Sequence, residues 1–461
     1  MTTCTSRRTV LTSMLAGAAT GLLPTRALAK ATGERPNFVV FYVDDLGYGD
    51  VEPTGGRTIK TPYLSRMARG GATLTDYYAP ANLCTPSRAG YLTGRYPIRT
   101  GLARGVIMQN SEIGLPPSEV TIAEALQPAY TTALVGKWHL GNPGTASWPP
   151  TKHGFDLFYG IQYSHDMLPL SLWEIQAGQT RQMDVNQVTL QQQFGTRAEQ
   201  FIEDNRERPF FLTLALSSPH LPNFPSPEFA GRSAAGAYGD VVEEMDAIVG
   251  RVMAKIEQLG LSRNTLVVFT SDNGPWFEGS AGALRDRKGG GAYDGASRVP
   301  FIASRPGIIP AGLRSDSIAM GIDLLPTLCN MAGLPLPPGV ALDGRDITQI
   351  LRRDAPSPHE QLLLFNDEDL VGLRTQRWKY VDADYYRNML FPLRGRGYPQ
   401  LYDMRMPGED YSVASLHPEV ARTLAARLEV ARERFEPLRT GPSSISQFPP
   451  SERNVPAQWR D

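Results

Sequence analysis

Two continuous apolar runs limit the folds open to this chain, because each has the length of a strand and each ends in oxygen-bearing side chains. Residues 36–43 lead directly into an Asp-Asp pair, and residues 265–270 lead into a Ser-Asp-Asn sequence. Strands that are apolar on both faces are typical of the centre of a parallel sheet covered by helices. Ligands bind such open α/β sheets outside the carboxyl ends of the strands. The two runs therefore predict an α/β fold with a binding site at one sheet edge.

The oxygen-bearing side chains after the two runs form a candidate metal site. They are Asp44, Asp45, Asp272 and Asn273. Carboxylates and amides suit a hard divalent ion, Ca²⁺ or Mg²⁺, rather than Zn²⁺. Acidic turns also close strands without binding a ligand, and spacing alone does not bring the two strand ends together. The sequence indicates an oxygen-only metal site and leaves a polar turn as the alternative.

Other strand ends present cations and imidazoles. Residues 132–135 form a short apolar run before Lys137 and His139, and residues 209–216 form another before His220. Their lengths fit further strands of the same covered sheet. We therefore expect these polar side chains near the same sheet edge.

Two further segments lie between residues 240 and 291. Apolar residues at three- and four-residue intervals predict a helix over residues 240–259, and we assign this stripe to core packing. Residues 284–291 form a flexible basic loop that contains Lys288. Taken alone, the charges of this loop suit a solvated surface.

The pattern changes near residue 355. Short apolar runs joined by turns indicate an antiparallel meander, over residues 362–365, 371–374, 378–381 and 401–403. Apolar residues on one face predict a final helix over residues 418–436. We therefore expect a main α/β domain over residues 30–355 and a smaller α+β domain over residues 356–461.

Residues 1–29 have the features of an export signal. Paired arginines, Arg7 and Arg8, precede a weakly apolar stretch, and Ala27-Leu28-Ala29 fits a small-X-small cleavage site. Polar residues, glycine and proline interrupt the stretch, so it lacks the run of about 20 apolar residues that a membrane anchor needs. The segment predicts a twin-arginine-type signal peptide, export machinery as a partner, and a periplasmic or secreted product without a stable membrane anchor.

The composition fits an exported globular enzyme. The chain has 461 residues, of which 41% are hydrophobic and 20% charged, so disorder is not indicated. Loss of residues 1–29 removes their arginines and no acids, which moves the formal charge from −1 to about −4. No basic bias supports a nucleic-acid partner. Cys4 would leave with the signal, and Cys84 is a candidate for chemistry on grounds given below, so Cys329 is expected to remain without a disulfide.

A short helix is predicted around Cys84. Thr85 is a suitable N-cap, Pro86 fits the first turn, and Gly94 is a natural C-terminal stop. The positive end of the helix dipole and Arg88 would then stabilise a Cys84 thiolate. These residues alone predict a nucleophilic cysteine, with a buried apolar cysteine as the alternative.

The same segment resembles the signature of the type I sulfatases, a formylglycine-dependent family of the alkaline phosphatase superfamily. In that family, Cys-X-Pro-Ser-Arg followed by Leu-Thr-Gly-Arg directs oxidation of the cysteine to formylglycine. The matching residues are Cys84, Pro86, Ser87, Arg88, Leu92, Thr93, Gly94 and Arg95. Further matching motifs lie at residues 44–50, 136–141, 218–220 and 271–275 and in the loop bearing Lys288. The resemblance covers most of the mature chain and is nearest to the arylsulfatase A-like branch.

The resemblance implies a fold, a cofactor and a set of roles. The fold is alkaline phosphatase-like, with a mostly parallel central sheet covered by helices. Ca²⁺, with Mg²⁺ less favoured, would be held by Asp44, Asp45, Asp272, Asn273 and an oxygen of modified Cys84. The aldehyde hydrate and the sulfate would be surrounded by Arg88, Lys137, His139, His220 and Lys288. A formylglycine-generating enzyme would be a further partner.

The chemistry of a sulfate ester accounts for these residue types. A divalent ion together with Arg and Lys donors neutralises the ester as a nucleophile approaches. A hydrated aldehyde can take the sulfuryl group on one hydroxyl and expel sulfate when the other loses its proton, which restores the carbonyl. By resemblance, His139 would help to deprotonate the hydrate, with Asp272 as a second candidate base. His220 and Lys288 would act at the leaving oxygen, and the sequence does not decide which is the acid.

Three functions fit these patterns. The first is a sulfatase that acts on an aryl or carbohydrate sulfate ester. The second is a phosphonate or phosphate monoester hydrolase of the same superfamily, and the third is a non-catalytic binder of sulfated glycans with unmodified Cys84. We favour the sulfatase because every polar position expected for catalysis is present. The loops expected to shape the pocket, residues 102–110 and 147–183, have no readable pattern, so the natural ester is not predicted.

Three positions outside the shared motifs need separate interpretation. His153 is predicted to be a structural turn residue. His165 lies in a segment that resembles substrate-side loops of the arylsulfatase-like branch, and it is a candidate substrate contact. Asp294-Gly295-Ala296 stands where many family members have Glu-Gly-Gly. Because an acid and a small residue are kept, the difference affects the expected detail of this loop more than the expected catalysis.

Overall fold

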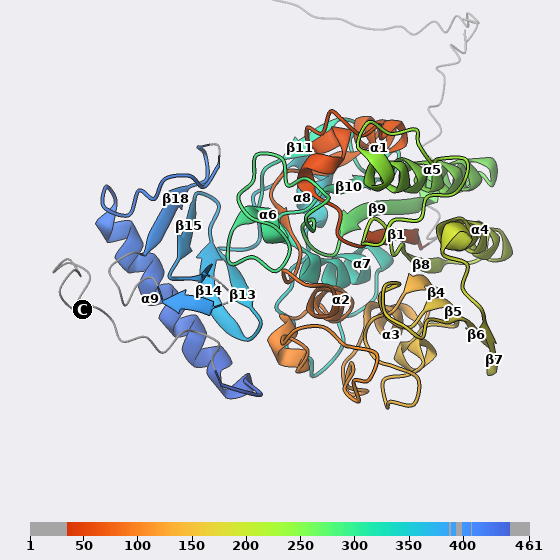
Figure 1. Ribbon diagram of the computed structural model, residues 1–461, viewed down its shortest axis with the longest axis horizontal. Helices are drawn as coiled ribbons and strands as arrows, with labels where there is room; N and C mark the ends of the chain where they lie inside the picture. The colour runs from red at the N-terminus through yellow and green to blue at the C-terminus, as the bar shows by residue number, and fades with distance from the viewer. Residues whose placement is uncertain (1–34, 387–388, 393–398, 407, 443–461) are drawn as a thin grey trace, which may run out of the picture. The chain divides into compact units, whose positions relative to one another are not determined.

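The computed structural model describes residues 35–386, 389–392, 399–406 and 408–442. Its centre is a ten-stranded sheet (Figure 1). In sheet order the strands are β11 (Leu313–Ser315), β2 (Ala72–Leu74), β10 (Phe301–Ser304), β9 (Thr265–Ser271), β1 (Asn37–Val43), β8 (Phe210–Ala215), β4 (Thr131–Lys137), β5 (Leu157–Ile161), β6 (Leu172–Gln176) and β7 (Gln179–Met183). The strands from β9 through β1, β8 and β4 to β5 are parallel, whereas β10 and β6 run antiparallel to both neighbours. The predicted mostly parallel α/β sheet is confirmed.

The N-terminal predictions fall largely outside the described residues. Residues 1–29, the predicted signal peptide, belong to the part that the structure does not describe. Among the described helices, none combines the length and the apolar character needed to span a bilayer. Export therefore stays a prediction.

β1 is buried on both faces because its side chains alternate between two apolar cores. Val39, Phe41 and Val43 pack in one core with α1 (Pro62–Arg69), α4 (Gln187–Asp204) and α5 (Gly236–Gln258). Phe38, Val40 and Tyr42 pack in the other with α2 (Cys84–Thr93), α3 (Ile122–Leu126), α7 (Leu324–Ala332) and α8 (Thr348–Arg353). Full burial of each such side chain contributes about 1.5–3 kcal/mol. The helix predicted over residues 240–259 is α5.

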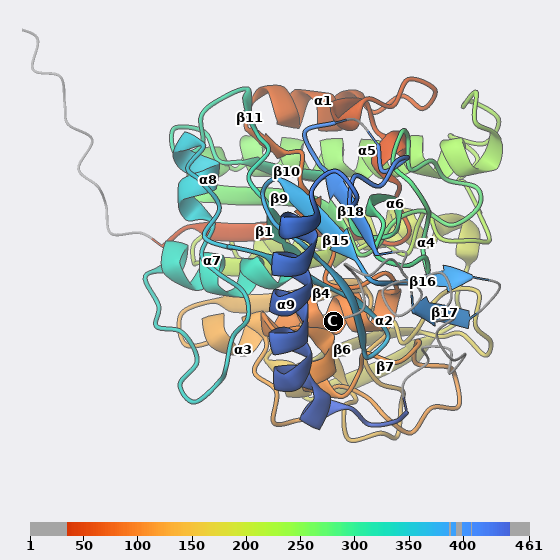
Figure 2. The same ribbon diagram turned by 90° about the vertical axis from the view of Figure 1, so that its left-hand side faces the viewer.

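A four-stranded antiparallel sheet follows the main sheet in the chain. It consists of β13 (Leu362–Asn366), β14 (Asp369–Arg374), β15 (Trp378–Val381) and β18 (Gln400–Asp403). Helix α9 (Pro418–Phe435) runs along β14 and β15 (Figure 2). The predicted meander and final helix are confirmed. Tyr96 and Ile98 share one apolar cluster with Leu428 and Phe435 of α9, so the domain division at residue 355 remains a prediction.

The remaining elements are short. Two-stranded pairs join β3 (Tyr77–Tyr78) to β12 (Ala319–Met320) and β16 (Ala383–Tyr386) to β17 (Met389–Pro392). Helix α6 (Asp294–Ser297) follows the loop that bears Lys288. Single 3₁₀ turns occupy Tyr48–Asp50, Glu52–Thr54, Pro97–Thr100, Pro150–His153, Ser262–Asn264, Gly321–Asp323 and Glu436–Leu438.

Lys379 of β15 connects the smaller sheet to α6. Its fully buried Nζ pairs with Asp294 and lies 2.7 Å from Glu409 Oε1. Glu409 Oε2 in turn accepts a hydrogen bond of 2.8 Å from the backbone N–H of Asp294, and Arg298 Nη1 pairs with the Asp294 carboxylate at 2.9 Å. The acid at position 294, where the family motif has Glu, therefore belongs to a buried charge network. This network fixes the start of α6 against the smaller sheet.

We expect Lys379→Met to lower the free energy of unfolding by about 3–5 kcal/mol, because it leaves two buried carboxylates without their shared cation. The matched control is Arg377→Met in the turn before β15, since Arg377 is 45% exposed where it pairs with Asp403 at 3.0 Å. This exposed pair contributes at most about 1 kcal/mol. Denaturant unfolding followed by circular dichroism measures both losses. Equal losses would contradict the assignment of Lys379 to a buried network.

Candidate active site

The carboxyl ends of β1 and β9 meet. The two strands are parallel neighbours with Val43 opposite Ser271, and Asp272 N donates to Val43 O at 2.9 Å. Beyond the strands, Asp45 N donates to Asp272 Oδ1 at 3.2 Å, and Asn273 Nδ2 donates to Asp45 Oδ1 at 2.8 Å. The structure thus brings together the acids and the amide that follow the two apolar runs.

The oxygens at these strand ends could hold a metal ion. Oxygens of Asp44 and Asp272 lie within 4.8 Å of each other and of Cys84 Sγ. Asp44 Oδ1 and Asn273 Oδ1 are buried and have no hydrogen-bond partner among the described residues. Because buried oxygens without donors are costly, these two atoms fit a role as cation ligands. The donor set therefore suits the hard divalent ion expected from the sequence.

The acids of this group differ in their ionisation. Burial raises the pKa of Asp44, but Lys137, followed by His220 and Arg88, lowers it more, so the net pKa lies well below the usual value. Burial and the neighbouring Asp44 carboxylate raise the pKa of Asp272 to about 7. The two carboxylates repel each other, which separates their pKa values. A bound cation would reduce this repulsion.

Cys84 begins α2, and two expectations about it are wrong. The N-cap is Leu83, not Thr85, whose hydroxyl is used elsewhere. Burial raises the pKa of the Cys84 thiol to about 12 in spite of the Lys137 and Lys288 charges, so the thiolate expected at this helix start is not favoured near neutral pH. The expected C-terminal stop is correct, since Gly94 adopts the left-handed φ of 67° that glycine tolerates.

Two buried cations hold the acids in place. Arg88 Nη2 and Nε donate to Asp272 Oδ2 at 2.8 and 3.1 Å, and Arg88 Nη1 donates to Lys137 O at 3.0 Å. Lys137 Nζ lies 2.5 Å from Asp44 Oδ2. Gly136, the residue before Lys137, lets β4 lie close to β8 here, because its φ is +117° and a Cβ there would lie 1.9 Å from Ala215 O on β8.

His139 offers a buried acceptor nitrogen. Its Nε2 lies 2.9 Å from Ile107 O, which can only accept, so the proton is on Nε2 and Nδ1 carries a lone pair. Nδ1 is buried and has no partner in the described part of the chain. Burial, then the Lys137 and Arg88 charges, hold the pKa of His139 well below its usual value, which keeps the ring neutral.

The hydroxyl of Thr85 fixes the segment around His139. Thr85 Oγ1 donates to His139 O at 3.1 Å and accepts from Ile107 N at 3.0 Å. His139 adopts a φ of 58°, a left-handed conformation that a non-glycine residue keeps only when its surroundings impose it. The Thr85 hydroxyl, which sequence reasoning assigned to a helix cap, therefore fixes the backbone on both sides of the His139 ring.

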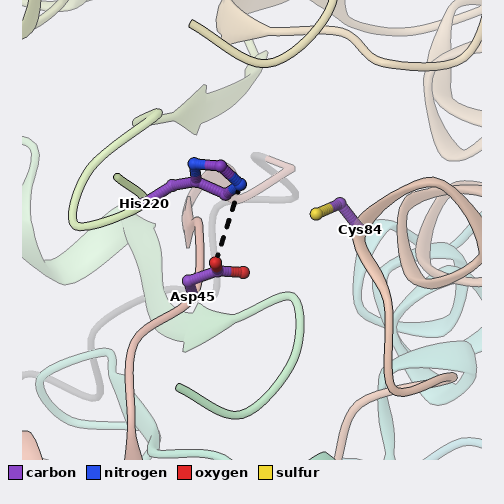
Figure 3. Close-up of side chains that lie close together, drawn as sticks. All are labelled: Asp45, Cys84 and His220. Atoms are coloured by element: carbon purple, nitrogen blue, oxygen red, sulfur yellow. Dashed lines mark ion pairs between the residues drawn. The ribbon is translucent and has the colours of Figure 1, made fainter. Parts of the chain in front are cut away.

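His220 and Lys288 face Asp45 from the other side of the group. His220 Nε2 lies 3.7 Å from Asp45 Oδ2, and Lys288 Nζ lies 2.7 Å from the same oxygen. Figure 3 shows the Cys84 sulfur pointing toward the His220 ring and the Asp45 carboxylate. Burial lowers the pKa of Lys288, but Cys84, Asp45 and Asp44 raise it by more than burial lowers it. The net pKa lies above the usual value, so the ammonium is charged. All predicted site residues therefore lie in one cluster.

The other histidines have clear positions. His165 packs edge-on against His220 with ring centres 5.7 Å apart, and its Nε2 lies 2.9 Å from Pro222 O. His153 lies 3.2 Å from Ser147 O and packs on Trp138, as a structural residue would. Sequence reasoning overlooked Ser164, whose buried hydroxyl beside His165 has no partner among the residues described. A serine without a motif gives no sequence signal.

Comparisons with known proteins agree with this geometry. The sulfatase family profile matches residues 36–334. Human arylsulfatase A is 36% identical over 94% of this chain and 94% of its own length. This chain belongs to the sulfatase family. Its arylsulfatase A-like affiliation is confirmed, and sulfate-ester hydrolysis, as well as use of a metal ion and formylglycine, is general in the family.

Solved structures of sulfatases share the fold. The PsFucS1 sulfatase from Pseudoalteromonas sp. superposes with a TM-score of 0.80 at 27% identity, over 89% of this chain and 92% of that chain. The expected alkaline phosphatase-like fold is therefore confirmed. A phosphonate monoester hydrolase from Silicibacter pomeroyi, at 19% identity and a TM-score of 0.63 over 87% of this chain and 95% of that chain, shares the fold alone.

We expect Thr85→Val to lower kcat up to about 100-fold with a smaller effect on KM, because loss of the hydroxyl releases the His139 segment while Arg88, Lys137 and Lys288 keep their positions. Position 85 is the variable X of Cys-X-Pro-Ser-Arg, so the formylglycine content, measured by peptide mass spectrometry, should not change. Thr327→Val is the matched control, since Thr327 is buried and its hydroxyl accepts from Ile347 N at 3.0 Å. Equal loss of kcat in both variants would rule out the positioning role.

Proposed function

We propose that this chain is an exported sulfatase that hydrolyses aryl or carbohydrate sulfate esters to an alcohol and inorganic sulfate at a formylglycine made from Cys84. The observation that carries the proposal is the meeting of acidic ligands, an amide and buried cations around Cys84. Such a group neutralises a bound anion and leaves one side chain free for chemistry. Export and the identity of the ester belong to this proposal.

The proposed metal ion is Ca²⁺, with Mg²⁺ less favoured. Asp44, Asp45, Asp272 and Asn273 would hold it together with an oxygen of modified residue 84. These ligands are all oxygens once the sulfur is replaced, and a site built mainly from protein carboxylates and an amide suits Ca²⁺ better than Mg²⁺, which usually keeps several waters. The ion would supply positive charge to the sulfate oxygens.

The protein side chains divide into two groups by the atoms that they would contact. Arg88, Lys137 and Lys288 carry donors that can bind sulfate oxygens. The modified residue supplies a hydroxyl nucleophile and a second hydroxyl through which the aldehyde is restored. His139 Nδ1, the buried acceptor, would take the proton of a hydroxyl on residue 84, with Asp272 as a second candidate.

The leaving oxygen would meet His220 and Lys288. His220 Nδ1 lies 2.6 Å from Leu221 O, a carbonyl that fixes the ring by accepting a hydrogen bond from the Nδ1–H. Nε2 then faces the site, where it can carry a proton to the leaving group. Lys288, as the charged neighbour, would stabilise negative charge on the same oxygen.

The proposed route to the mature enzyme involves two partners. A formylglycine-generating enzyme would oxidise Cys84 inside the cell, and the twin-arginine machinery would then export the folded protein by way of residues 1–29. The periplasm or the exterior would be its place of action. The twin-arginine route accepts folded proteins, which fits a chain whose sequence predicts no disulfide.

Two alternatives stay open. The first is a phosphonate or phosphate monoester hydrolase of the same superfamily, a reaction that the shared fold by itself does not distinguish from sulfate-ester hydrolysis. A non-catalytic glycan binder would keep Cys84 as a thiol.

We expect Cys84→Ala to abolish sulfate-ester turnover and leave the fold intact, because the side chain serves chemistry more than packing. Cys329→Ala is the matched control, since its thiol is also buried but lies on α7, and turnover should persist. Turnover is measured with an aryl sulfate and an aryl phosphonate, and circular dichroism follows the fold. Preference for the phosphonate would support the phosphorus alternative. An alkylatable thiol at position 84 in active material would disprove the formylglycine mechanism.

We expect a Ca²⁺ chelator to suppress turnover and added Ca²⁺ to restore it more fully than Mg²⁺. Ca²⁺ should also raise the unfolding temperature, because it binds the native state. Asn273→Ala should remove this shift, whereas Asn205→Ala should retain it, since Asn205 is buried but only donates to Phe201 O at 2.8 Å. The ion assignment would fail if Ca²⁺ left both turnover and unfolding temperature unchanged.

A further inference from the structure

The turn after the β9 strand end carries two exposed aromatic side chains that the proposed chemistry does not use. Trp276 and Phe277 are 39% and 71% exposed, and their rings meet edge-to-face at 4.5 Å. Isolated apolar side chains at a surface are ordinary, whereas an exposed aromatic pair next to a polar site is typical of a ligand-binding surface. The pair therefore needs a function.

The aromatic pair is attached to the segment that bears Lys288. Arg287 Nη1 donates to three carbonyls of the turn, those of Trp276 at 3.1 Å, Phe277 at 3.3 Å and Gly279 at 2.6 Å. Lys288 N donates to Pro275 O at 3.0 Å. Because the backbone of the turn is held in this way, the rings stay exposed without being loose.

The pair also borders the site directly. Lys288 Nζ lies 5.9 Å from the centre of the Trp276 ring and 2.7 Å from Asp45 Oδ2. A leaving oxygen that accepts from Lys288 lies about 3 Å from Nζ. A ring attached to that oxygen on the Trp276 side of Lys288 can reach the range of about 4.5–7 Å in which aromatic pairs attract each other.

Other loops around the site also contain exposed apolar side chains. Met108, 50% exposed, follows Ile107, whose carbonyl holds His139. Leu168, 69% exposed, lies in the loop of His165, and Phe224, 38% exposed, lies in the loop of His220. Each of these loops, like the turn of Trp276, has a polar residue in the site or in contact with it and an exposed apolar residue nearby in the sequence.

The exposed charges of the same loops do not suit a polyanionic saccharide. They include the acids Glu112, Asp166 and Glu278. Of the arginines in these loops, Arg104 pairs with Glu368 at 2.6 Å and Arg287 donates to the turn carbonyls. Arg232 lies over the Phe229 ring. A chain of several sulfates would meet acids there, whereas a neutral ring would not.

We infer that Trp276 and Phe277 are specificity-determining residues that stack against a flat aromatic leaving group while its sulfate occupies the site around residue 84. This inference rests on the proposed sulfatase function and narrows it to aryl esters. The rings contact the substrate but take no part in proton transfer.

The test compares Trp276→Ala, Phe277→Ala and the conservative Trp276→Phe with the unaltered, modified enzyme. Substrates are 4-methylumbelliferyl sulfate, which has a flat ring, and glucose 6-sulfate, which has none. We expect kcat/KM for the aryl ester to fall about 10- to 100-fold in each alanine variant and much less in Trp276→Phe. Tyr411→Ala, which removes an aromatic side chain 85% exposed in the C-terminal part, should change neither rate.

Binding separates this inference from the proposed function. The probes are 2-naphthalenesulfonate, which carries a ring, and inorganic sulfate, which does not. Weaker binding of the naphthalenesulfonate alone in the alanine variants supports the aromatic surface, even if the unaltered enzyme hydrolyses no sulfate ester and the sulfatase proposal fails. Unchanged binding and rates would overturn the inference. An equal or larger loss with glucose 6-sulfate would overturn it as well, in favour of a surface that stacks on sugars.

Discussion

The burial of three carboxylates at one sheet edge is the constraint on which the rest of the structure depends. β1 and β9 are parallel neighbours, so Asp44, Asp45 and Asp272, which follow their carboxyl ends, lie side by side and are buried. Carboxylates placed there repel each other unless cations and donors compensate. Arg88 reaches them from α2, and Lys137 reaches them from the end of β4. The positions of α2 and β4 therefore supply the positive charges that the buried carboxylates after β1 and β9 require.

The compensation is balanced in charge but incomplete in hydrogen bonds. With Lys288, three cations face the three acids, yet Asp44 Oδ1 and Asn273 Oδ1 lack donors among the described residues. A divalent ion on these oxygens would give the site a net positive charge, which an anionic ester then offsets. The same geometry therefore accounts for a need for metal and for a preference for anions. A fully satisfied cluster would need neither.

The sequence is informative where pattern and packing agree. Continuous apolar runs locate β1 and β9, because both faces of these strands are buried. Residues 179–183 of β7 are mostly exposed and polar, so the hairpin of β6 and β7 leaves no apolar alternation to read. The partners of the Thr85 hydroxyl, among them His139, are far away in the sequence. The pKa of Cys84 depends on burial by the whole fold, which outweighs the Lys137 and Lys288 charges. Motifs name the members of the site, whereas their roles depend on contacts that only the fold supplies.

The smaller sheet gives the Lys288 loop a rigid base and leaves its neighbouring turn exposed. Asn82, two residues before Cys84, donates to Gly290 O and to Asn366 Oδ1 of β13, which ties the loop to both the site and the smaller sheet. Arg285 donates to Tyr402 OH of β18 at 3.0 Å. Contacts of this kind fix the loop on the side away from solvent, where catalysis demands constant geometry. Arg287 holds the Trp276 turn through backbone carbonyls of the turn. The side chains of Trp276 and Phe277 can therefore be substituted without moving the loop. Under the proposed function, substitutions in the Trp276 turn would change substrate preference without displacing Lys288.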